Sequence, residues 1–143
     1  MRRILLSTLV LASCSLFVAN RAECGKPGGG GGGSVTSTFQ AVNSSGVAGR
    51  VSLSERSSST IISVSLNGLQ PDVEYIASWS PTVACDMGTL APDGAFYRFR
   101  GSKRGTASFR QDVAVPLSSI HSIAIQMDTN GSGLILVACA PVN

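Results

Sequence analysis

The sequence predicts an all-β domain of eight short strands, arranged as a β-sandwich or a Greek-key barrel. Three observations support this prediction. Short segments of alternating apolar and polar residues are separated by turn-forming residues, and no segment has a convincing helical period. Hydrophobic residues make up 43% of the chain and charged residues 13%, which excludes a disordered chain and suits facing sheets.

Residues 1–22 are predicted to be an export signal. Two arginines follow the first methionine, and the apolar stretch Ile4–Ala19 is too short and too interrupted by polar residues to span a bilayer. Cleavage after Ala22 would give a secreted, extracellular protein. Alternatively, the sequence Leu-Ala-Ser-Cys ending at Cys14 resembles a bacterial lipoprotein box, and a lipid on Cys14 would anchor the chain in the envelope.

Residues 23–34 are predicted to be a glycine-rich flexible tether. The six glycines Gly28–Gly33 have no side chains to pack and lose much backbone entropy on ordering. No Lys-Ser or Lys-Thr follows them, which argues against a phosphate-binding loop. Cys24 lies on this tether, where it could pair with Cys14, link two chains as a disulfide-bonded dimer, or stay unpaired.

Residues 35–143 are predicted to form the β domain. In Val47–Leu53 and Thr60–Leu66, apolar residues alternate with Ser, Arg and Ala, as in strands buried on one face. Asn67-Gly68 and Pro71-Asp72 mark turns. The expected strands are Val35–Val42, Val47–Leu53, Thr60–Leu66, Val73–Trp79, Ala95–Arg100, Thr106–Val115, Ser122–Gln126 and Leu134–Cys139.

The net charge of +3 belongs to the predicted leader. The chain has 11 Lys and Arg residues against eight Asp and Glu residues, and Arg2, Arg3 and Arg21 would leave with the signal. The mature chain would therefore be neutral. This balance gives no support to nucleic acid as a partner.

Three motifs follow one another along the β domain. A hairpin that begins Gly46-Val47-Ala48-Gly49 ends in the turn Gly68-Leu69. Gly105-Thr106-Ala107 leads to Leu117-Ser118-Ser119-Ile120-His121-Ser122-Ile123, and Gly133–Cys139 ends in Ala-Cys. In this order they resemble the copper-zinc superoxide dismutase superfamily, across nearly all of residues 35–143. The resemblance implies an eight-stranded Greek-key β-sandwich or barrel of the superoxide dismutase-like type.

The resemblance also implies a disulfide between Cys85 and Cys139. Cys139 ends the terminal motif, and Cys85 falls in the loop where the family keeps the other half of its single disulfide. Such a bond requires an oxidising compartment. In the chain-entropy model, closing so long a loop stabilises the fold by roughly 4 kcal/mol.

The positions that correspond to the family's metal centre hold residues that do not suit metal binding. Counting from Gly68-Leu69, the two copper-binding histidines correspond to Ala77 and Trp79. A further copper ligand corresponds to Gln126, and the substrate-steering arginine corresponds to Leu136. The segment that corresponds to the zinc loop, Asp86–Leu90, has no histidine.

The whole chain has one histidine, His121. Copper sites of this class need several imidazoles, and a structural zinc needs about four ligands. His121 corresponds to a family position that is not a ligand, and we expect it to be structural or on the surface. We therefore expect no catalytic residue, metal or cofactor, and a non-enzymatic structural or interaction role. The alternative is a weak or unusual copper/zinc-binding superoxide dismutase.

Five basic residues lie close together in the sequence, interleaved with Phe96, Tyr97 and Phe99. One hypothesis is a hairpin whose arginines point outward and protect an edge strand from aggregation. The other is a patch that binds an anionic surface or glycan. The residues are Arg98, Arg100, Lys103, Arg104 and Arg110.

Two further patterns bear on the surface and on the fold. Asn43-Ser44-Ser45 and Asn130-Gly131-Ser132 fit the N-glycosylation pattern. Leu69–Tyr75 resembles the fibronectin type III corner, Leu-x-Pro-x-x-x-Tyr, which implies a buried, structural Tyr75 and an adhesion module. Unpaired Cys85 and Cys139 together with a buried Tyr75 would favour that third hypothesis.

Overall fold

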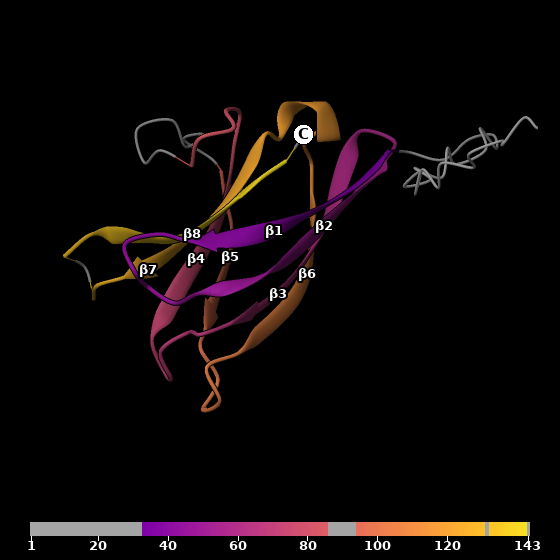
Figure 1. The fold of residues 1–143 in the computed structure, drawn as a ribbon. Helices are drawn as coiled ribbons and strands as arrows, with labels where there is room; N and C mark the ends of the chain where they lie inside the picture. The colour runs from indigo at the N-terminus through magenta and orange to yellow at the C-terminus, as the bar shows by residue number, and fades with distance from the viewer. Residues whose placement is uncertain (1–32, 86–93, 131, 143) are drawn as a thin grey trace, which may run out of the picture.

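The computed structural model describes residues 33–85, 94–130 and 132–142, and most of them lie in eight antiparallel strands (Figure 1). The all-β prediction is confirmed: each expected strand is present, with ends that shift by at most three residues. The short 3-10 helix η2 (Leu117–Ser119) precedes β7, and no α-helix occurs in these ranges. The strands are β1 (Ser34–Ala41), β2 (Ala48–Arg56), β3 (Ser59–Asn67), β4 (Glu74–Ser80), β5 (Ala95–Arg100), β6 (Ala107–Val113), β7 (Ser122–Asp128) and β8 (Leu134–Pro141).

All eight strands belong to one sheet, in the order β5-β4-β7-β8-β1-β2-β3-β6. The sheet curls into a nearly closed barrel, so that its two end strands, β5 and β6, come into contact. Aromatic rings meet where these ends approach: Phe109 of β6 lies 4.4 Å from Tyr97 and 4.9 Å from Phe99 of β5, between ring centroids. Packing of apolar rings therefore joins the two ends of the sheet.

Alternate residues of β2 and β3 fill the barrel. Val51, Leu53, Ile62 and Val64 are at most 2% exposed and belong to one core cluster. Burial of each such side chain contributes about 1.5–3 kcal/mol. The serines between them lie on the opposite face, because successive side chains of a strand alternate between faces. The alternation in the sequence thus predicted the buried face of both strands correctly.

Three glycines meet at one end of the barrel, and each belongs to a tight turn. Gly46, Gly68 and Gly105 have positive φ values of 71°, 76° and 70°. A Cβ on Gly68 would collide with the carbonyl oxygen of Gly46, and a Cβ on Gly105 would lie 2.6 Å from the carbonyl oxygen of Leu69. A backbone hydrogen bond also joins these turns, since the N–H of the buried Leu69 donates to the Gly105 carbonyl at 3.0 Å. Close backbone approach explains the glycines at positions 68 and 105, and the positive φ alone favours glycine at position 46.

Candidate functional site

β4 and β7 are buried on both faces over most of their length. Tyr75 and Ala77 of β4 and Ile123 and Ile125 of β7 belong to the barrel core. The residues that alternate with these core residues lie on the outer face of the sheet, and they too are at most 3% exposed. They pair across the two strands as Ile76 with Gln126, Ser78 with Ala124, and Ser80 with Ser122.

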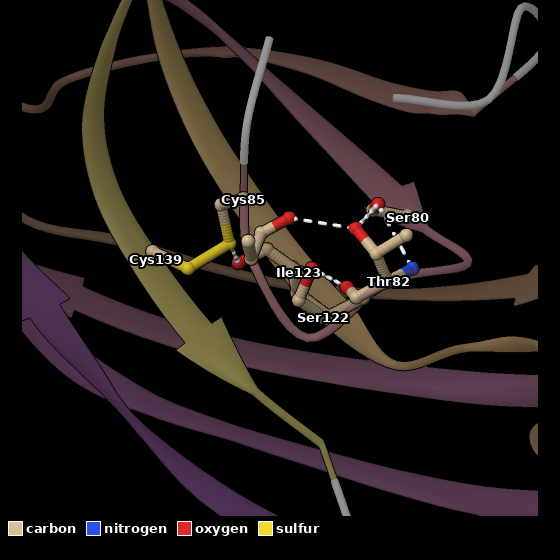
Figure 2. The surroundings of a disulfide bond; sticks show 7 residues. Ser80, Thr82, Cys85, Ser122, Ile123 and Cys139 are labelled. Atoms are coloured by element: carbon tan, nitrogen blue, oxygen red, sulfur yellow. Dashed lines mark hydrogen bonds between the residues drawn. A yellow bond between two sulfur atoms is a disulfide. The ribbon is translucent and has the colours of Figure 1, made fainter. Parts of the chain in front are cut away.

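The outer face is covered in part by the segment that follows β4. The Ser122 hydroxyl donates to the Thr82 carbonyl at 2.7 Å, and the Thr82 N–H donates to the Ser80 hydroxyl at 3.2 Å (Figure 2). The segment then reaches Cys85, whose disulfide to Cys139 of β8 is present as expected. The bond closes a sequence separation of 54 residues. Hydrogen bonds and one covalent bond therefore hold this segment against β7 and β8.

A hydrogen bond joins the two buried polar side chains at the centre of this face. The Ser78 hydroxyl donates to Gln126 Oε1 at 3.0 Å. Among the described residues, every buried side-chain nitrogen or oxygen has a hydrogen-bond partner. Satisfied buried polar groups stabilise one packing arrangement of a sheet and offer no free donor or acceptor to a ligand.

The three positions at which the sequence resemblance places copper ligands do not lie on one face of the sheet. Ala77 is fully buried in the barrel core, and Trp79 is half-buried against the same core. Gln126 lies on the outer face, where its neighbours on β4 are Ile76 and Ser78. An isoleucine, a serine hydroxyl and an amide do not suit copper or zinc. Within residues 33–85, 94–130 and 132–142, no cluster of three or more His, Cys, Asp or Glu residues could hold a metal ion.

His121 and Leu136 both form hydrogen bonds through their backbone. His121 is exposed, its N–H donates to the Ser80 carbonyl at 2.9 Å, and its carbonyl accepts from Val142 N–H at 2.7 Å. Its backbone therefore links the end of β4 to the C-terminal end of the described chain. Leu136 is half-buried on β8, and its carbonyl accepts from Asn43 Nδ2 at 3.2 Å.

The five clustered basic residues lie in three different places. Arg98 Nη1 on β5 lies 2.9 Å from Glu74 Oε1 and 3.4 Å from Asp128 Oδ2, and Arg100 Nη2 lies 3.8 Å from Glu74 Oε2. Lys103 and Arg104 are exposed in the turn between β5 and β6. Carboxylates therefore compensate much of the positive charge on β5, although such exposed pairs add only about 0–1 kcal/mol to stability.

The fifth basic residue, Arg110, lies on the outer face of β6 and shares a surface depression with an arginine that the sequence patch did not include. Arg50 of β2 and Arg110 line the same shallow depression of about 510 Å³. Alternation along β2 had placed Arg50 on the outer face, but sixty residues separate it from Arg110 in the sequence. The order of the strands brings them together, since β3 alone lies between β2 and β6.

The tyrosine corner and the asparagines of the two glycosylation patterns also lie in the described chain. Tyr75 is 1% exposed, and its hydroxyl accepts from the Gln70 N–H at 2.9 Å. The corner expected of a fibronectin type III module is thus present, but so is the disulfide that was expected to argue against one. Asn43 and Asn130 are both exposed in turns, with φ values of 54° and 55°.

Residues 1–32 and 86–93 lie outside the described residues. The export signal, Cys14, Cys24, most of the tether and the segment Asp86–Leu90 belong to these ranges. No helix in the described part of the chain is long and apolar enough to cross a membrane. A comparison with protein-family models and with curated proteins finds no match for this sequence.

Proposed function

We propose that this chain is a secreted, non-enzymatic domain of the superoxide dismutase-like type, which acts by binding a partner. The observation that supports this proposal most strongly is the set of residues on the outer face of β4 and β7. In the resemblance, copper ligands come from these two strands, and here Ile76 and the Ser78–Gln126 hydrogen bond occupy the buried face that they share. Redox chemistry of this class needs several imidazoles, and these residues supply none.

The strand order supports the superoxide dismutase-like and Greek-key part of the proposal. β4, β5 and β6 follow one another around the barrel, and β7 returns to lie beside β4. This is the pattern of three consecutive strands with a fourth beside the first. The tight turns at Gly46, Gly68 and Gly105 also give a physical reason for the glycines of the first two sequence motifs.

The Cys85–Cys139 disulfide supports an extracellular or envelope location. Disulfides persist in oxidising compartments and are rare in the cytosol. This observation agrees with the export signal that the sequence predicts.

A fibronectin type III-like adhesion module is the second candidate, because the buried Tyr75 hydroxyl ties β4 to the preceding turn at Gln70. Such modules consist of two packed sheets. The continuous eight-stranded sheet and the disulfide favour the first proposal.

Elemental analysis of the purified exported protein tests the proposal. After incubation with copper and zinc and removal of free metal, we expect less than about a tenth of an equivalent of either metal. A His121→Ala variant serves as the control for loose binding at the single imidazole. Stoichiometric metal retained by both proteins would overturn the proposal and make dismutase activity the next assay.

A further inference from the structure

The outer face of β1, β2, β3 and β6 carries an ordered array of hydroxyl and guanidinium groups. These four strands are neighbours in the sheet (Figure 1). Residues directly opposite one another on antiparallel strands point to the same face. One row across the strands is Thr38, Arg50, Ser65 and Ser108, and the next is Thr36, Ser52, Ser63 and Arg110.

The two arginines of this array have no acidic partner among the described residues. Arg50 and Arg110 are exposed, and neither forms an ion pair there. Arg98 and Arg100 differ, because both lie near Glu74. Two strand spacings and two residues separate Arg50 from Arg110, which corresponds to about 12 Å between Cα atoms. Their charge is therefore available to a ligand that spans both.

Two shallow depressions adjoin each other on this face. The depression of about 510 Å³ between the arginines is lined by Val64 and Phe109 and by four serines, Ser52, Ser63, Ser65 and Ser108. A second depression of about 380 Å³ shares Arg50 and Ser65 with it and extends to Thr38 and Asn67. The two depressions share residues and together form one elongated, shallow surface, which we call the serine groove.

We propose that the serine groove binds an acidic polysaccharide, a chain of sugar rings that bear carboxylate or sulfate groups. A guanidinium matches a carboxylate or sulfate with two parallel hydrogen bonds. Serine and threonine hydroxyls both donate and accept, as sugar hydroxyls require. Two arginines about 12 Å apart suit repeated charges on one polymer better than a single small anion. The inference deepens the proposed interaction role and rests on it.

The same face argues against nucleic acid. Among the described residues of these four strands, the aromatic side chains belong to the inner face: Phe39 is in the core, and Phe109 packs against Tyr97 and Phe99. This face therefore offers no ring on which a base could stack. Asp112 lies two residues beyond Arg110 on the same face, opposite Ile61, and adds a negative charge near the end of the groove.

The test measures the affinity of the full exported chain for heparin and for a polyuronate, with neutral dextran as the uncharged control. We expect the Arg50→Ser/Arg110→Ser variant to lose about tenfold or more in affinity for at least one acidic polymer. Arg98→Ser/Arg100→Ser removes the same charge from β5 and should lose less than about threefold, because those arginines already have carboxylate partners. Arg50→Lys/Arg110→Lys should keep only part of the affinity, since lysine retains the charge but cannot form the two parallel hydrogen bonds of a guanidinium.

Three results would overturn the inference: equal losses in the two double variants, absence of binding to both acidic polymers, or tighter binding to duplex DNA or anionic lipid vesicles. All four arginines are exposed, so thermal unfolding of each variant should match that of the parent. The metal analysis is independent of this test. A protein that retained metal and also bound through the groove would contradict only the non-metal part of the proposed function.

Discussion

The Ser78 hydroxyl donates a 3.0 Å hydrogen bond to Gln126 Oε1 across β4 and β7, outside the barrel core. Both side chains are at most 3% exposed. The resemblance seen in the sequence places copper ligands on this pair of strands. Here the same pair of strands is joined by a neutral hydrogen bond, which makes the face a structural element of the fold.

Removal of the Ser78 hydroxyl should destabilise the protein. Ser78→Ala takes one partner from a buried amide, which costs about 1–3 kcal/mol. Ser65→Ala, on the exposed face of β3, should change stability by less than about 0.5 kcal/mol. Urea denaturation of both variants measures the difference. Equal stability of the two variants would mean that the Ser78–Gln126 bond contributes nothing to the fold.

Loss of the disulfide should be more costly. Cys85→Ala/Cys139→Ala frees the unfolded chain across a separation of 54 residues, and we expect a loss of about 2–5 kcal/mol. Denaturation of the parent protein with and without a reductant provides the matched comparison. Peptide mapping under non-reducing conditions checks the pairing, and a Cys85 linked to any cysteine other than Cys139 would contradict it.

Gly68→Ala should disrupt the turn at the end of β3. Gly68 and Gly46 both have positive φ, but a Cβ on Gly68 meets the Gly46 carbonyl oxygen, while one on Gly46 has no atom within 4 Å. Gly46→Ala should therefore cost about 1 kcal/mol for the backbone conformation alone. Gly68→Ala should cost more by at least about 1 kcal/mol. Thermal unfolding compares the two, and equal effects would exclude the collision as a cause.

Introduced histidines test which residues of β4 share a face with Gln126. Ile76→His/Ser78→His/Gln126→His places three imidazoles on the outer face of adjacent strands, and we expect it to gain copper binding near one equivalent. Ala77→His/Trp79→His/Gln126→His puts two imidazoles into the barrel core and should lose its cooperative unfolding transition.

Copper titration with near-ultraviolet circular dichroism distinguishes these outcomes. If the variant with histidines replacing Ala77, Trp79 and Gln126 folded and bound copper, and the variant replacing Ile76, Ser78 and Gln126 did not, Ala77 and Trp79 would share the face of Gln126. That result would contradict the assignment of faces on β4. The parent protein, with Gln126 intact, is the control for both.

Local patterns in the sequence were enough to locate the eight strands. Alternation has a period of two residues, so a strand such as β3 shows its buried residues, Ile62 and Val64, without reference to any other strand. The turn at Asn67-Gly68 was also predictable from local sequence, because asparagine and glycine favour turns. The Cys85–Cys139 pair was expected from the resemblance and not from spacing, because the pairing of distant cysteines depends on the fold.

Counting along the chain could not determine which face of β4 lies beside Gln126. A change of one residue in the turn between Gly68 and β4 moves every side chain of the strand to the opposite face. The pairing of Ile76 with Gln126 settles the faces, and places Ala77 and Trp79 toward the core.

The serine groove depends on the tertiary structure even more strongly. Each strand alone shows only that Arg50, Ser63 and Arg110 point outward. These residues share one surface only because β2, β3 and β6 are neighbours in the sheet. The connection between β3 and β6 is long, so no local sequence pattern indicates that the two strands pair. Side-chain alternation is a property of each strand, whereas the neighbours of a strand result from the closure of the whole barrel around its core.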